Sequence, residues 1–201
     1  MSRSKADNID KFHDYSIYLP NRLLFMGNEE NSLEHGESGT DGAMAERMLK
    51  NLAILDTMSQ DPITIIMNNI GGDFMNGMAI YDAISACESE IIIKAYGNAM
   101  SMGSIIFQAA DKRIMAPNAV QMIHYGTWSF SGHAKTGYKW ANDNKRLDEW
   151  MENMYLTRIQ EKQPGFKIKA LEKMLDHDTF LTARESVDLG LADAILGEES
   201  E

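Results

Sequence analysis

Apolar positions follow two alternating periods along most of the chain. Pro62 opens the run 63–67, which is rich in β-branched residues and apolar at nearly every position, as in a parallel strand buried on both faces. Apolar residues at helical spacing follow over 74–87. The same order of strand and then helix recurs at 91–96 and 102–110, with a break expected at Gly97. This alternation predicts an α/β domain whose parallel strands are joined by right-handed crossovers.

The other predicted elements complete one domain over residues 15–197. A helix is expected at 43–58, and strands at 113–116 and 120–123 flank a Pro-Asn turn. A long helix over 134–161 carries one apolar stripe: Leu147, Trp150, Met151, Met154 and Tyr155. Because such a stripe needs a cover, it predicts association with further copies of the chain. Three segments lack periodicity: a flexible N-terminal segment at 1–14, an acidic glycine-rich loop at 28–42 and an acidic tail at 198–201.

Composition narrows the classes of function. The chain has 19 Lys and Arg against 30 Asp and Glu, a net charge of −11, which argues against binding to nucleic acid or to an anionic membrane. We also expect no membrane span, because no apolar run approaches the roughly 18–20 residues needed. The single cysteine, Cys87, excludes an internal disulfide and fits the cytoplasm. No HExxH spacing or Cys/His cluster is present, so neither a metal nor another cofactor is expected.

Residues able to do chemistry follow the predicted strands, where ligands gather on open α/β sheets. Gly71 and Gly72 follow the strand at 63–67; they form either a tight turn or a loop that points free N–H groups at a ligand. Ser101, between Gly97 and Gly103, resembles a relaxed G-x-S-x-G nucleophile elbow, although it could simply cap a helix.

A histidine and an aspartate complete a candidate site. His124 ends the run 120–123, and Asp178 precedes a capping box at Thr182 and Glu185. Each alone is compatible with a structural role. Together they match the need of a nucleophilic serine for a base, and of that base for a carboxylate that orients it. The order Ser101, His124, Asp178 differs from the Ser-Asp-His order of α/β-hydrolases and argues against that class.

Segments in a fixed order over about 15–196 resemble the proteolytic subunit of the Clp protease, a family of serine peptidases. N-I-G-G at 69–72 with G-M-A-I-Y-D at 77–82 is similar to the family's N-S-P-G-G…G-x-x-I-Y-D. G-N-A-M-S-M-G-S at 97–104 resembles the nucleophile segment G-x-A-A-S-M-G-S. The remaining matches are Q-M-I-H at 121–124, D-T-F-L-T-A at 178–183 and G-L-A-D at 190–193.

The resemblance implies a fold and an activity. The fold would be the ClpP/crotonase-type spiral of ββα units, with the helix at 134–161 as a protruding handle. The activity would be that of a serine endopeptidase without a cofactor, acting on peptides or unfolded protein. Ser101 would be the nucleophile, His124 the base and Asp178 its orienting acid, with an oxyanion hole at the N–H groups of Gly72 and Met102. Heptameric rings, stacked in pairs, and an AAA+ unfoldase partner are also implied.

The sequence departs from the family pattern at several positions. Ile70 stands in place of a proline, Thr64 and Ile66 in place of tyrosines of the ATPase-docking pocket, and His177 in place of an arginine of the ring–ring contact. These replacements leave open that the chain is an inactive structural subunit of a mixed ring. A crotonase-type acyl-CoA enzyme is a second alternative, because the same oxyanion geometry can hold a thioester enolate.

Overall fold

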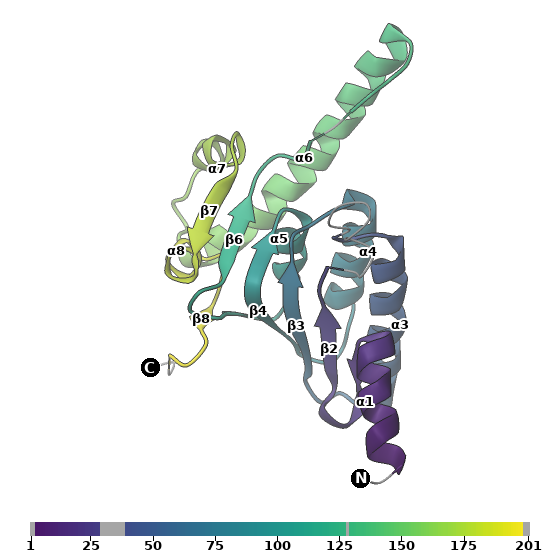
Figure 1. Cartoon of the computed structure of the whole chain (residues 1–201). Coiled ribbons are helices and arrows are strands. Elements are labelled where there is room, and N and C mark those ends of the chain that lie inside the picture. Colours follow the sequence, from purple (N-terminus) through teal and green to yellow (C-terminus); the bar gives the residue numbers. More distant parts are fainter. Residues whose placement is uncertain (1–2, 29–38, 128, 199–201) are drawn as a thin grey trace.

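The computed structural model describes residues 3–28, 39–127 and 129–198, and within these ranges the strands form one eight-stranded sheet. Its order is β1-β2-β3-β4-β5-β8, with β6 beside β4 and β7 beside β6 (Figure 1). The strands are β1 (Ile17–Tyr18), β2 (Leu23–Met26), β3 (Ile63–Asn69), β4 (Ile91–Met100), β5 (Lys112–Met115), β6 (Val120–Ile123), β7 (Thr179–Thr182) and β8 (Ala194–Ile195). Only the β1–β2 and β6–β7 pairs are antiparallel among the described strands. The α/β domain with a mostly parallel sheet is confirmed.

The helices alternate with the strands, as the periodicity predicts. They are α1 (Arg3–Tyr15), α3 (Gly42–Met58), α4 (Phe74–Ser85), α5 (Met102–Phe107), α6 (Ala134–Lys162), α7 (Ile168–Leu175) and α8 (Ala183–Leu189), with a 3-10 turn η1 (Leu19–Asn21). The core joins the sheet to α3, α4 and α5, and contains Leu24, Leu52, Ile65, Ile80 and Ile106. No helix of the described ranges is both long and apolar enough to cross a membrane.

Strand β3 is fully buried on one face only, so the expectation that it is buried on both faces is wrong. Along β3, Ile63, Ile65 and Met67 are buried, whereas Thr64 and Ile66 are only half-buried. A β-branched run does not reveal whether its second face is covered, because coverage depends on where distant helices pack.

Strand β4 runs on through the break expected at Gly97. Its first half pairs with β5, and its last residues, Asn98 to Met100, pair with β6. Gly97 has a φ of +73°, which glycine adopts without strain. The N–H of Asn98 donates to the side-chain oxygen of Asn68 on β3. The glycine therefore bends the strand toward a second partner instead of ending it.

The N-terminal segment forms a helix that packs on the domain. Where a flexible segment was expected at 1–14, the structure has helix α1, which Phe12 anchors through edge-on ring contacts with Tyr18 and Phe25. Its last turn is fixed by the side-chain amide of Asn51, which donates to the carbonyl of Tyr15. Most of the predicted acidic loop, residues 29–38, and most of the acidic tail, 199–201, lie outside the described residues.

Helix α6 confirms the predicted long helix and projects from the body of the domain (Figure 1). Its apolar stripe is not exposed as a whole. Met151 and Tyr155 are buried in the chain's own core, whereas Trp150 is 45% exposed and Tyr138, farther out, is 75% exposed. Of this stripe, Trp150 therefore stays exposed for contact with further copies of the chain, together with Tyr138 outside the stripe.

Candidate active site

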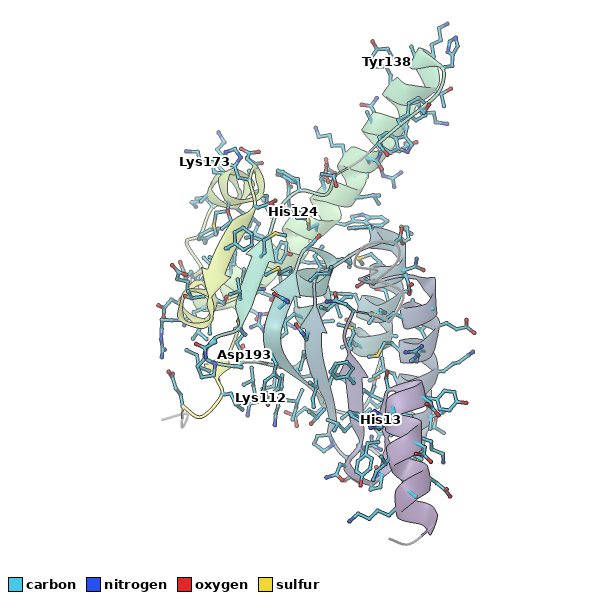
Figure 2. All side chains as sticks on the ribbon, viewed as in Figure 1. His13, Lys112, His124, Tyr138, Lys173 and Asp193 are labelled. Atoms are coloured by element: carbon cyan, nitrogen blue, oxygen red, sulfur yellow. The ribbon has the colours of Figure 1, made fainter. Side chains whose placement is uncertain are left out.

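The candidate residues converge because three neighbouring parallel strands end at the same edge of the sheet. Strand β4 lies between β3 and β6 and is parallel to both. Gly71 follows β3, Ser101 follows β4 and His124 follows β6. Figure 2 shows His124 at the end of β6, close to the base of α6.

A hydroxyl, an imidazole and a carboxylate form a hydrogen-bonded row at this edge. Nε2 of His124 lies 2.8 Å from Oγ of Ser101, and Nδ1 lies 2.8 Å from Oδ1 of Asp178. Asp178 reaches this place because β7 is antiparallel to β6, with Thr179 opposite Ile123. With its proton on Nδ1, the imidazole donates to the carboxylate and accepts from the hydroxyl, which suits a base acting on serine.

The imidazole and the carboxylate differ in their exposure to solvent. The side chain of His124 is 19% exposed and that of Asp178 is 62% exposed. Solvent screens an exposed charge. Asp178 is therefore placed to fix the orientation of the ring more than to stabilise its charge.

Ser101 occupies a sharp turn between β4 and α5. Its backbone has φ 50° and ψ −124°, outside the region that non-glycine residues normally occupy. The turn is held from both sides, because the N–H of Ser101 donates to the carbonyl of Met122 and its carbonyl accepts from the N–H of Ser104. A strained conformation that the surroundings enforce is a feature of functional sites.

Two backbone N–H groups are available beside Ser101. Met102 is the first residue of α5, where an N–H has no acceptor within the helix. Gly72 forms a parallel bridge with Thr40, but the bonds of this bridge use the carbonyl of Gly71 and the N–H of Asp73. The N–H of Gly72 is therefore left out of the bridge, and both residues line one pocket together with Ser101 and His124. Such a pair of donors can stabilise an oxyanion.

The pocket beside Ser101 has a volume of about 460 Å³ and walls from α4, α5 and α6. Most of its larger side chains are apolar: Phe74, Met102, Ile105, Trp140 and Met151. Two carboxylates also line it, Asp73 and Asp148. This volume lies within the range of about 300–1,000 Å³ that is usual for ligand pockets, so there is room for part of a substrate. Met102, next to Ser101 in the sequence, is one of the lining residues.

The serine, histidine and aspartate of this row are the candidates named from the sequence, whereas most of the residues around them are not. Ser104 on α5 is fully buried, and its hydroxyl accepts a hydrogen bond from the side-chain amide of Gln121. Phe74, Ile105 and Trp140 were not proposed as pocket residues, because helical spacing alone cannot tell a pocket wall from a core. Within the described ranges, no group of three or more His, Cys, Asp or Glu residues could hold a metal ion.

A hydroxyl, an imidazole and a carboxylate in a row beside free amides is an arrangement used by serine hydrolases. The chain belongs to the Clp protease family, whose model matches residues 29–199. The expected ClpP-type fold is thereby confirmed.

Two relatives show how far the similarity extends. An ATP-dependent Clp protease proteolytic subunit of Deinococcus radiodurans is 27% identical over 190 residues, which cover 93% of this chain and 86% of that protein. The chloroplastic ATP-dependent Clp protease proteolytic subunit 3 of Arabidopsis thaliana is 27% identical over 201 residues, covering 98% of this chain. The match spans 60% of the length of the Arabidopsis protein.

Proposed function

We propose that the protein is a serine endopeptidase that cleaves peptide bonds through an acyl-enzyme on Ser101. The observation that carries the proposal is the row of two 2.8 Å contacts from Ser101 through His124 to Asp178. The family membership supports the same class of activity. The only cysteine is a poor competitor as nucleophile, because burial and nearby carboxylates raise the pKa of Cys87 to about 11.

The reaction would proceed in two halves. Oγ of Ser101 attacks the peptide carbonyl carbon while Nε2 of His124 takes the hydroxyl proton, and the N–H groups of Gly72 and Met102 donate to the resulting oxyanion. The C–N bond then breaks, and His124 protonates the departing amine, which leaves an ester on Ser101. His124 next deprotonates a water molecule that attacks this ester. The acid product leaves, and the proton returns to Ser101.

Larger substrates and an oligomer are part of the proposal. Both relatives are named as ATP-dependent Clp protease proteolytic subunits, which supports an ATPase partner. The proposal includes a chamber of stacked heptameric rings supplied with unfolded protein by an AAA+ unfoldase, as the family resemblance implies. The exposed aromatic residues Trp150 and Tyr138 on α6 offer surfaces for contact between copies. A cytoplasmic location is also part of the proposal, supported by the single cysteine, which fits a reducing compartment.

Hydrolysis of short unstructured peptides tests the proposal. We expect the purified chain to cleave fluorogenic peptides with an apolar residue before the scissile bond, without ATP, and to leave folded proteins intact. Product masses should show a new carboxyl and a new amino terminus. A chain that cleaves no peptide but binds acyl-CoA thioesters would contradict the proposal in favour of a crotonase-type enzyme. If the isolated chain is inactive but assembles into a ring with a second, active protein, the chain is a structural subunit instead.

Replacing the orienting carboxylate should slow the reaction without preventing it. We expect Asp178→Asn to lower kcat about 100-fold with little change in KM, less than the roughly 10⁴-fold loss typical of a buried partner, because this side chain is 62% exposed. Steady-state peptide hydrolysis measures the effect. Asp176→Asn, two residues away and also exposed, is the control. Equal rates for Asp178→Asn and the wild type would remove Asp178 from the mechanism.

A further inference from the structure

The glycine turn beside Ser101 is held on one side by Thr40. The N–H of Thr40 donates to the carbonyl of Gly71 at 2.5 Å, and the N–H of Asp73 donates to the carbonyl of Thr40 at 2.8 Å. Gly72, between these two bonds, lies so close to Thr40 that an added Cβ would be 2.4 Å from its carbonyl oxygen. Thr40 itself is 1% exposed. The orientation of the Gly72 peptide group is therefore set by a residue of another segment.

The same turn is held on its other side by Gly27 and Asn28. The side-chain amide of Asn69 donates to the carbonyl of Gly27 at 3.0 Å. The N–H of Ile70 donates to the side-chain oxygen of Asn28 at 3.1 Å. Residues just before and just after positions 29–38 thus hydrogen-bond to the turn on both of its sides.

Asn69 connects the two sides. Its side-chain oxygen accepts from the hydroxyl of Thr40 at 3.1 Å and from the N–H of Gly71 at 2.9 Å. It is fully buried, and an added Cβ on Gly103 would lie 2.6 Å from the same oxygen. This amide therefore links the flanking segment, the glycine turn and helix α5, which begins next to Ser101.

Ile70 explains why the turn needs these hydrogen bonds. It occupies the position where the related motif has proline, whose ring would restrict the turn by itself. Isoleucine lacks that restriction but has a backbone N–H. This N–H donates a hydrogen bond to the side-chain oxygen of Asn28. In this chain, hydrogen bonds therefore restrict the turn in place of the proline ring.

We propose that Asn28, Thr40 and Asn69 are positioning residues that aim the N–H of Gly72 at the oxyanion. The proposal rests on the proposed function, since it assigns these residues to the oxyanion hole of that same site. None of the three touches the reacting atoms. Their effect is on transition-state stabilisation and not on substrate binding, so it falls on kcat rather than on KM.

Thr40 offers a matched pair of substitutions. We expect Thr40→Val, which keeps the shape and loses the hydroxyl, to lower kcat and the rate of inactivation by a fluorophosphonate about 10-fold or more, with KM unchanged. Thr40→Ser keeps the hydroxyl and should retain wild-type kinetics. Thr157→Val is the control, because it removes a hydroxyl bonded only to the carbonyl of Asn153 on the exposed side of α6. Wild-type rates for Thr40→Val would overturn the proposal.

Asn28 is tested against the proline of the motif. We expect Asn28→Ala to slow inactivation in the wild-type background and to have no further effect in Ile70→Pro, which has no N–H for Asn28 to accept. Equal effects in both backgrounds would show that Asn28 acts by another route.

Amide hydrogen exchange separates this proposal from the proposed function. The peptide covering 69–73 should exchange about fivefold faster in Thr40→Val, the change expected for one lost hydrogen bond. If exchange accelerates but the wild type never reacts with the fluorophosphonate, the turn is held as described and the proposed function fails. If the wild type reacts and exchange is unchanged in Thr40→Val, the positioning role fails alone.

Discussion

Replacing Ser101 with alanine should abolish peptide hydrolysis. We expect kcat to fall about 10⁴-fold or more, because the acyl-enzyme can no longer form. His124→Ala should cost a comparable factor, since the hydroxyl then lacks the base that lies 2.8 Å away. The two residues act as one unit, so the double variant should be no slower than either single variant. Steady-state hydrolysis of a fluorogenic peptide measures all three.

The control for this series is a serine without a place in the site. Ser85→Ala, at the exposed end of α4, should keep wild-type activity. Additive losses from Ser101→Ala and His124→Ala would mean that the two residues do not act together. Substantial activity in Ser101→Ala would transfer the reaction to another group.

Adding a single methyl group to Gly71 should be nearly as damaging. The backbone there has a φ of +98°, and an added Cβ would lie 2.6 Å from Cβ of Ser101 and 2.8 Å from the N–H nitrogen of Met102. Gly71→Ala therefore pushes the nucleophile and one oxyanion donor out of place together. We expect a loss of about 100- to 1000-fold in kcat, with a lower melting temperature, measured by peptide hydrolysis and thermal unfolding.

Gly165→Ala is the matched control for this substitution. Nothing lies within 4 Å of a Cβ added there, and its φ is not in the left-handed region, so stability and activity should stay near the wild-type values. A Gly71→Ala variant that folds and retains full activity would contradict the close packing of the turn against Ser101.

The strands that carry the site were predictable because each is marked by an apolar run. His124 directly follows such a run, and Gly71 and Ser101 each come a few residues after one. The ends of neighbouring parallel strands meet at one edge. The partnership with Asp178 was suggested by chemistry and by the family pattern. Its geometric cause, the antiparallel register of β7 on β6, is a long-range pairing that local periodicity does not contain.

Other features depend on contacts that no local pattern encodes. Helix α1 was missed because its segment is polar and shows no clear apolar stripe. The contacts of Phe12 with Tyr18 and Phe25 stabilise the helix, but they exist only in the folded chain. The stripe on α6 is divided between core and solvent according to how far the helix projects, which spacing cannot show. The contacts of Thr40 were hidden for the same reason, since its side-chain partner Asn69 is 29 residues away in the sequence.

Intact-mass measurement after treatment with a fluorophosphonate is the most direct test of an activated hydroxyl on Ser101. In this reaction Oγ forms a bond to phosphorus, fluoride leaves, and the hydroxyl proton passes to His124. The account predicts one adduct per chain, on the peptide that contains Ser101, and no adduct in Ser101→Ala or on denatured protein. Absence of the adduct from the folded wild type, or an adduct on a different residue, would contradict it.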